Sequence, residues 1–232
     1  MEDDIVEAPS PNFDERDQSV SMVVLHYTGM ADGPSALARL RDPEAKVSAH
    51  YVVDEDGRVL RLVPEDKRAW HAGRSYWRGV TDVNGCSVGI ELVNPGHEFG
   101  YRPFAVPQMD ALLPLLAGIV RRHNVPPANV VGHSDVAPAR KQDPGELFDW
   151  ALLARHGLAI PRPIRDLADP QWTDGGFLLA LERWGYDVSD RGAAVIAFQR
   201  RFRPELLDGE IDGECRAILL ALLLDRESGR TI

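Results

Sequence analysis

The segment VVGHSDVAPARKQDPG, residues 130–145, constrains this chain more than any other, because it places a histidine, a lysine and an aspartate in one loop. Residues Asn129 to Val131 predict a short buried strand with His133 at its end. The two prolines that follow keep the intervening residues from forming a helix, so the loop can fold back. Imidazole and carboxylate groups are ordinary zinc ligands, and a catalytic zinc needs about three protein ligands. His133 and Asp143 are therefore candidate ligands, and a third is missing.

A second apolar run lies far upstream. The β-branched residues Val20 to Leu25 predict another buried strand, and His26 follows it as the best candidate for the third ligand. No compact spacing rule joins these residues as it joins the two histidines of an HExxH helix. From spacing alone, a structural role for each histidine stays open.

Strand and helix patterns alternate along the first 160 residues. We expect a short helix over Ser35–Leu40, a hairpin in AHYVVDEDGRVLRLV, a strand over Ser87–Val93 and an amphipathic helix over Pro107–His123. This alternation predicts an α/β fold with a mixed central β-sheet flanked by helices. Residues that carry chemistry should then gather at the ends of the strands.

The chain divides into four expected parts. These are an N-terminal arm (1–18), a main domain (19–160), a linker (161–171) and a small C-terminal three-helix domain (172–232). The three helical patterns of the last part are GFLLALERWGY, RGAAVIAFQRRF and GECRAILLALLL. Below about 70 residues such a bundle has a marginal core, so we expect it to dock on the main domain.

Composition excludes some classes of partner. A formal net charge of −10 argues against nucleic acid and anionic membranes, which bind basic patches. No apolar run approaches the roughly 20 residues of a transmembrane helix. The acidic N-terminus lacks the basic and apolar regions of a secretory signal, so we expect a cytoplasmic protein, or a periplasmic one if Met1 is not the native start.

Cys86 and Cys215 match no paired spacing and are expected to be free thiols. We expect a monomer.

Three further segments lie between HYT at residues 26–28 and the loop described first: SAHYVVDEDGRVLRLVPED, AWHAG and VGIELVNPG. In this order they resemble the zinc-dependent N-acetylmuramoyl-L-alanine amidases, which share the fold of peptidoglycan recognition proteins. The resemblance covers about residues 20–160 and is closest to the AmpD/AmiD group, which acts on muropeptides. The stretch from Trp172 onward, with GYDVSDRGAAVIAFQRRFRP and DGEIDGE, resembles a small helical peptidoglycan-binding domain.

This resemblance implies an activity and a set of active-site residues. The reaction is hydrolysis of the amide between N-acetylmuramic acid and the first L-alanine of a stem peptide, with Zn²⁺ held by His26, His133 and Asp143. Glu91 lies within the apolar strand VGIELV, where a carboxylate is costly to bury unless it faces a polar cleft. It is the expected general base and proton shuttle. Lys141 is expected to stabilise the oxyanion of the tetrahedral intermediate.

Other residues in family-like segments are expected to line a substrate groove. The candidates for substrate binding are His71 in WHAG, Trp70, Trp77, Asn84 and Arg140. For the tryptophans, packing in the core is an equally good interpretation. Arg140 could be a surface charge. His50 is expected to support the sheet or to orient a ligand. Three histidines carry no motif and are expected at the surface: His97, His123 and His156.

Several functions remain open at this point. We favour a cytoplasmic enzyme that recycles 1,6-anhydromuropeptides released by cell-wall turnover. A periplasmic amidase that trims intact peptidoglycan is the first alternative. A non-catalytic recognition protein of the same fold and an unrelated metallohydrolase, such as a peptidase, are the others. Because candidates are present for all three ligands and for both catalytic residues, an enzyme is favoured over a recognition protein.

Overall fold

The computed structural model describes residues 5–164 and 167–228. A mixed six-stranded sheet with the order β1-β5-β4-β7-β3-β8 forms its centre. Strands β3 (Met22–Tyr27), β7 (Ser87–Leu92) and the edge strand β8 (Val130–Gly132) are parallel to one another. Strand β4 (Tyr51–Val53) is parallel to β7 and forms the expected hairpin with β5 (Val59–Arg61). The predicted α/β fold with a mixed sheet is confirmed.

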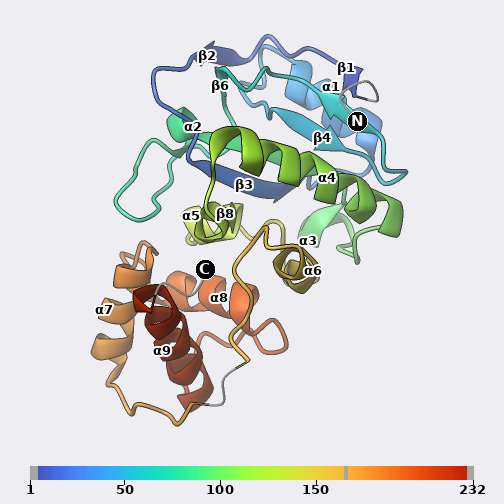
Figure 1. Cartoon of the computed structure of the whole chain (residues 1–232). Helices are drawn as coiled ribbons and strands as arrows, with labels where there is room; N and C mark the ends of the chain where they lie inside the picture. Colours follow the sequence, from blue (N-terminus) through green and yellow to red (C-terminus); the bar gives the residue numbers. More distant parts are fainter. Residues whose placement is uncertain (1–4, 165–166, 229–232) are drawn as a thin grey trace.

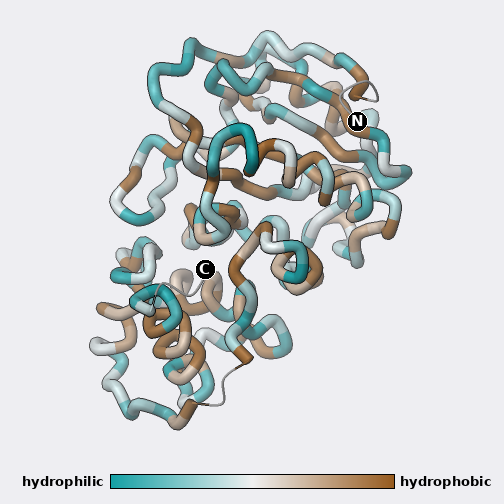
Figure 2. Tube along the Cα trace, viewed as in Figure 1, coloured by the Kyte–Doolittle hydropathy of each residue, from teal (hydrophilic) through white to brown (hydrophobic). Residues whose placement is uncertain are grey.

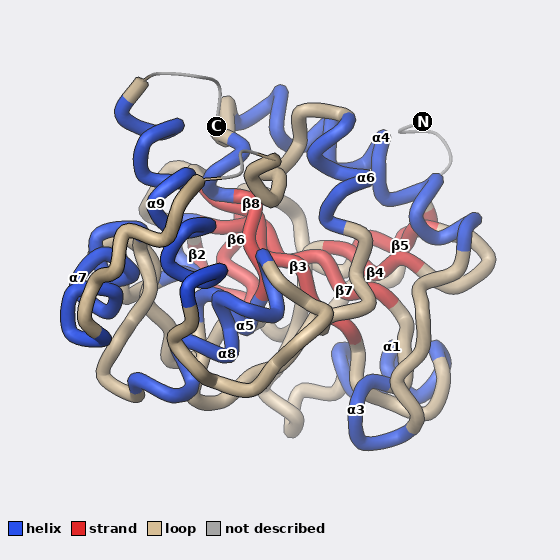
Figure 3. The backbone as a smooth tube through the Cα atoms, turned by 90° about the horizontal axis from the view of Figure 1, so that it is seen from below, coloured by secondary structure: helices blue, strands red, loops and turns tan. Residues whose placement is uncertain are grey.

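The alternation of side chains along β3 sorts residues onto the two faces of the sheet. Val23 and Leu25 pack in one apolar cluster with helix α4 (Val106–His123), whereas Met22 and Val24 belong to a second cluster on the other face. His26 therefore shares the face opposite α4. Figure 3 shows the strands as one layer with helices on both sides, and Figure 2 shows hydrophobic residues following the strands.

Helix α4 covers one face for nearly the full width of the sheet (Figure 1). Its start carries a proline within the first two positions, where a missing N–H costs little, and Asn124 ends it in the left-handed conformation. The predicted helix over Pro107–His123 is confirmed. Helix α6 (Trp150–Arg155) packs in the same cluster, and α1 (Gly33–Arg41) covers the opposite face of β4 and β5.

The described part of the N-terminal arm pairs with strands of the main domain. Strand β1 (Val6–Glu7) pairs with β5, and β2 (Phe13–Glu15) pairs with β6 (Lys67–Ala69) in a small second sheet. The guanidinium of Arg16 donates to the carbonyl oxygens of Gly85 and Ser87 at 2.7 and 2.8 Å. The arm thus wraps the main domain, and Arg16 holds the start of β7 in place. Residues 1–4 of the arm lie outside the described residues.

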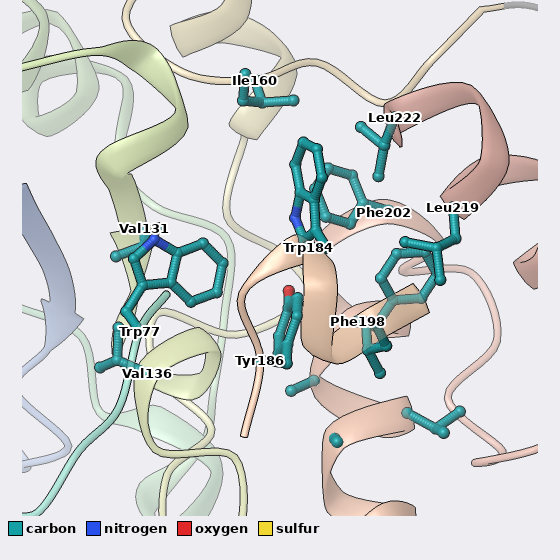
Figure 4. Packing of buried hydrophobic residues seen from close by; sticks show 14 of the residues in the cluster. Trp77, Val131, Val136, Ile160, Trp184, Tyr186, Phe198, Phe202, Leu219 and Leu222 are labelled. Carbon is teal, nitrogen blue, oxygen red and sulfur yellow. The ribbon is translucent and has the colours of Figure 1, made fainter. Parts of the chain in front are cut away.

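Helices α7 (Asp174–Trp184), α8 (Arg191–Phe202) and α9 (Gly213–Glu227) form a group below the sheet in Figure 1 and match the three predicted helices. An aspartate or threonine side chain caps each start. One apolar cluster joins them to the main domain, with Trp77 and Val136 on one side and Trp184 and Phe198 on the other (Figure 4). The expected docking is therefore confirmed. The boundaries at 160 and 171 stay predictions, and the linker includes residues 165–166, which are not described.

Some local expectations were wrong by a residue or more. His26 lies within β3 rather than after it, because its backbone still pairs with β7. Asn129 belongs to a 3-10 turn, η2 (Pro127–Asn129), that precedes β8. The short helices α2 (Val83–Cys86), α3 (Gly96–Phe99) and α5 (His133–Val136) were not predicted. Cys86 and Cys215 are buried free thiols, as expected. Among the described residues no helix is long and apolar enough to cross a membrane.

Candidate metal centre and active site

The side chains of His26, His133 and Asp143 meet at the carboxyl ends of strands β3 and β8. The two histidine Nδ1 atoms lie 2.9 Å apart, and each lies 3.0 Å from Oδ2 of Asp143. All three residues are buried, and together they form a group that could hold a metal ion. The three candidate ligands are thus brought together, although His26 is more than 100 residues from the other two in the chain.

The topology explains why they meet. Strands β3 and β8 are parallel neighbours, with Leu25 opposite Gly132, so the residues that follow at their carboxyl ends share one edge of the sheet. The loop after α5 then turns back, because the backbone N–H of Ser134 donates to the carbonyl of Asp143 at 2.9 Å. This bond places the carboxylate of Asp143 beside His133.

The protonation of His133 follows from its other nitrogen. Nε2 of His133 lies 3.1 Å from the carbonyl oxygen of Ala72, an acceptor only, so Nε2 carries the proton. In the neutral ring Nδ1 then has a free lone pair, and this lone pair faces Asp143.

A chain of hydrogen bonds fixes the neutral tautomer of His26 in the same way. The Ser87 hydroxyl donates to the carbonyl of Val83, so it accepts from Nε2 of His71 at 3.1 Å. Nδ1 of His71 is then an acceptor, and it receives the Nε2 proton of His26 at 3.1 Å. Nδ1 of His26 is left with a lone pair that also faces Asp143.

In these neutral tautomers, three lone pairs converge on one point. Such an arrangement is repulsive unless a cation lies among the three atoms, and two neutral imidazoles with one carboxylate suit zinc. The hydrogen bonds to Ala72 and His71 are the outer contacts that orient metal-binding histidines. The donor set thus fits the metal that the family resemblance implies.

The electrostatics favour the ligand forms of these groups. Burial is the main cause that lowers the pKa of His26 to about 4, and repulsion from a protonated His133 is the second, so the His26 ring is neutral at pH 7. Burial alone would raise the pKa of Asp143, but His133 and His26 outweigh it and hold the pKa below its usual range. Asp143 is therefore ionised, and deprotonated ligands are what a metal needs.

Glu91 stands beside this group on the next strand. It is opposite His26 in the β3–β7 register, so both side chains leave the same face of the sheet. Its Oε2 is buried and has no hydrogen-bond partner among the described residues. Burial, and then the charge of Asp143, raise the pKa of Glu91 well above its usual value. A carboxyl group with a raised pKa suits general acid–base catalysis.

A pocket of about 400 Å³ opens over the group. Its wall contains the three candidate ligands, Glu91 and Lys141, together with three of the expected groove residues: Trp70, His71 and Arg140. The guanidinium of Arg140 donates to the carbonyl oxygens of Ala72 and Arg74, which holds the loop after His71 in place. The structure thus gathers most of the predicted site residues around one cavity.

Two expected groove residues lie elsewhere. Trp77 is 3% exposed and packs edge-on against Tyr186, with ring centroids 5.2 Å apart. The Asn84 side chain accepts the backbone N–H groups of His71 and Ala72 at 3.1 and 2.7 Å. Neither lies on the pocket wall. Trp77 packs between the two parts of the chain, and Asn84 positions the loop that carries His71, so their contact with the substrate stays a prediction.

One wall of the pocket was missed by the sequence analysis. Nδ1 of His97, expected at the surface, lies 2.9 Å from the hydroxyl of Tyr27, and its ring stacks on Tyr101 at 4.3 Å. Its Nε2 lies 3.1 Å from Glu146, which in turn contacts Arg200 at 3.4 Å. Tyr27 could have been noticed because it follows His26 directly. No sequence signal marks His97.

The remaining histidines do not line the pocket. Nδ1 of His50 accepts the backbone N–H of Gly89 at 2.9 Å, and its Nε2 donates to the carbonyl of Lys67 at 3.0 Å. His50 thus supports the sheet, as expected. His123 pairs with Glu65 at 2.5 Å, and His156 is exposed.

Comparisons with known proteins agree with this geometry. The family model Amidase_2, N-acetylmuramoyl-L-alanine amidase, matches residues 16–146. The amidase AmiD of Escherichia coli K12 is 40% identical over 251 residues, which cover 94% of this chain and 90% of the relative. The 1,6-anhydro-N-acetylmuramyl-L-alanine amidase AmpD of the same organism is 34% identical over 166 residues, which cover 62% of this chain and 86% of the relative.

Two solved structures share the fold over most of the chain. E. coli AmiD in complex with anhydro-N-acetylmuramic acid-L-Ala-D-γ-Glu-L-Lys has a TM-score of 0.81 at 36% identity and covers 92% of this chain and 98% of its own. AmpDh3 of Pseudomonas aeruginosa in complex with anhydromuramic pentapeptide has a TM-score of 0.79 at 32% identity, with 91% and 93% covered. The chain belongs to the N-acetylmuramoyl-L-alanine amidase family and is an enzyme of that class.

Proposed function

We propose that the protein hydrolyses the amide bond between 1,6-anhydro-N-acetylmuramic acid and L-alanine of the stem peptide, with one zinc ion held by His26, His133 and Asp143. The observation that carries this proposal is the convergence of two histidine Nδ1 atoms and Oδ2 of Asp143, 2.9–3.0 Å apart, beside Glu91, whose buried Oε2 has no hydrogen-bond partner among the described residues. The related AmiD and AmpDh3 structures contain anhydromuropeptides, which supports the choice of sugar.

Zinc at these ligands would polarise the scissile carbonyl and lower the pKa of water toward 7. Glu91 then moves the protons. Its carboxylate takes a proton as the water oxygen bonds to the carbonyl carbon. The carboxylic acid returns this proton to the departing nitrogen when the carbon–nitrogen bond breaks. A raised pKa suits both directions of transfer.

Lys141 supplies positive charge to the same pocket. Its charge opposes the rise in the pKa of Glu91, so the ammonium lies within electrostatic reach of the carboxyl. We propose that it stabilises the negative oxygen of the tetrahedral intermediate. The backbone N–H of Lys141 is bonded to the carbonyl of Ala137 at 3.0 Å, which fixes the position from which the side chain starts.

His71 and Arg140 are proposed to contact the substrate from the pocket wall. Both nitrogens of His71 are already hydrogen-bonded, so its substrate contact would be through the ring edge, while the same ring orients His26. Arg140 is exposed at the pocket and can meet a carboxylate of the stem peptide. All of these residues come from one chain, which supports a monomer as the active unit.

The proposed role is the recycling of anhydromuropeptides released during wall turnover, which would place the enzyme in the cytoplasm. The second candidate role is trimming of intact peptidoglycan in the periplasm. It is favoured by the three C-terminal helices, which resemble a wall-binding domain and pack on the catalytic part. The preferred substrate separates the two roles.

Mass spectrometry of products tests the reaction. The protein is incubated with 1,6-anhydro-N-acetylmuramoyl tripeptide, with intact sacculi and with the free tripeptide, each with and without a zinc chelator. We expect the anhydro sugar and the intact tripeptide from the first substrate, and no product when the chelator is present. Cleavage inside the free tripeptide would indicate a peptidase. No cleavage of either wall substrate by the zinc-loaded protein would indicate a recognition protein.

A further inference from the structure

A buried hydrogen bond joins the C-terminal helices to the loop that carries His133. The hydroxyl of Tyr186, in the connection between α7 and α8, donates to Oδ1 of Asp135 at 2.6 Å. Tyr186 is fully buried and Asp135 is 2% exposed. Figure 4 shows Tyr186 between Trp77 and Val136 on one side and Phe198 on the other. The bond is therefore shielded from water.

Asp135 acts on the backbone next to the metal ligands. Its second oxygen, Oδ2, accepts the backbone N–H of Gly132 at 2.7 Å, so it closes the turn from β8 into α5. His133 lies inside this turn. On the other side, the N–H of Ser134 is held by the carbonyl of Asp143. The backbone around His133 is thus fixed by two aspartates, one a candidate metal ligand and the other bonded to Tyr186.

The geometry leaves little freedom for an alternative arrangement. A side chain at Gly132 would meet Cδ of Pro144 at 2.7 Å, so the turn lies directly against the segment of Asp143. A small rotation of Asp135 would therefore shift His133 relative to Asp143. Helices α5 and α8 also pack against each other, and Tyr186, which precedes α8, therefore lies next to the turn.

Charge near the bond comes from α8. Arg201 is buried, stacks over Trp150 with its guanidinium carbon 3.2 Å from the ring centroid, and acts electrostatically on Asp135. A buried carboxylate with a positive charge nearby and both oxygens hydrogen-bonded is held in one orientation. The C-terminal helices supply both the charge and one of the hydrogen bonds.

We propose that Tyr186 is a positioning residue for the metal centre, acting through Asp135 on the backbone at Gly132 and His133. The C-terminal helices then do more than pack against the catalytic part or bind polymer: they help to set the spacing of the zinc ligands. This inference rests on the proposed zinc site. It assigns a role in metal affinity to a residue that lies outside the pocket.

The test is the zinc dissociation constant of the full-length Tyr186→Phe variant, measured by competition with a chromophoric chelator. Removal of the hydroxyl leaves Oδ1 of Asp135 without this donor, and we expect zinc to bind about tenfold more weakly, the lower end for outer contacts of a metal site. The melting temperature of the zinc-free protein is measured in parallel. Unchanged zinc affinity in Tyr186→Phe overturns the proposal.

Two further variants separate positioning from general packing. Leu222→Ala removes a buried side chain of α9 from the same apolar cluster, so it should lower the melting temperature and leave zinc affinity unchanged. An equal loss of zinc affinity there would overturn the proposal. Asp135→Asn tests the route: adding Tyr186→Phe to it should weaken zinc binding no further, and additive losses would contradict an action through Asp135. Failure of the wild type to bind zinc would instead refute the metal centre itself.

Discussion

His26 and Glu91 are opposite each other on the parallel strands β3 and β7, and both side chains leave the same face of the sheet. The sheet register therefore sets the distance between a candidate zinc ligand and the proposed base without any flexible loop. Sites built on strands are more precise than sites built on loops. The other two ligands reach the same edge through β8 and the loop that follows it.

Glu91→Gln tests the proposed base. The amide has nearly the same shape as the carboxyl group but cannot exchange the proton, so turnover should fall by about 10²- to 10⁴-fold. Zinc content, measured by atomic absorption, should equal that of the wild type because Glu91 is not a ligand. Turnover within a few-fold of the wild type would assign the proton transfer to another group.

His97→Ala tests the missed wall of the pocket. His97 is stacked on Tyr101 and bonded to Tyr27 and Glu146, so its removal opens the wall without touching the ligands. We expect the His97 ring to contact the substrate. The loss of one aromatic contact of about 0.5–1.5 kcal/mol would raise KM roughly two- to tenfold, with little change in kcat. Steady-state kinetics on the anhydromuramoyl tripeptide measure both constants. A large fall in kcat at constant KM would place His97 in the chemistry instead.

Trp77→Ala distinguishes packing from substrate binding. Since Trp77 is buried between the two parts of the chain, its truncation should reduce the free energy of unfolding by about 3–5 kcal/mol. KM, measured well below the melting temperature, should stay as in the wild type. Denaturant titration gives the first quantity. A raised KM with unchanged stability would restore the original expectation of a groove residue.

The stability of the protein should depend on pH through His50. Burial lowers its pKa from 6.5 to about 3, so the folded protein keeps His50 neutral where the unfolded chain binds a proton. The contribution of His50 to the free energy of unfolding is fully present above pH 6.5 and is lost as the pH falls from 6.5 toward 3.

The magnitude is at most about 1.4 kcal/mol per pH unit for one group. Protonation would also break the bond that Nδ1 accepts from Gly89. Urea titrations between pH 4 and 8 should therefore show a shallower slope of unfolding free energy against pH in His50→Gln. Parallel curves for the two proteins would show that His50 does not contribute.

Most of the site could be predicted from the sequence because its residues stand in short motifs on strands. His26 and Glu91 end or interrupt apolar runs, and His133, Lys141 and Asp143 lie within one loop. The period-2 pattern of the strands and the parallel topology then bring the three segments to the same edge of the sheet.

The rest depended on tertiary contacts that no local pattern contains. His97 becomes part of the pocket because it contacts Tyr27 and Glu146, which are 70 and 49 residues away in the chain. Trp77 becomes a packing residue because the C-terminal helices cover it. Helix α5 escaped prediction because a single turn is stabilised here by Asp135 and not by hydrophobic periodicity.

Zinc titration of the metal-free protein tests the central claim most directly. Turnover of the anhydromuramoyl tripeptide is measured as zinc is added, alongside zinc bound per chain. We expect activity to rise in proportion to bound zinc and to reach its plateau at one ion per chain, with neither binding nor activity in Asp143→Ala. Full turnover by the metal-free protein, or an Asp143→Ala variant that binds zinc and turns over as the wild type does, would contradict it.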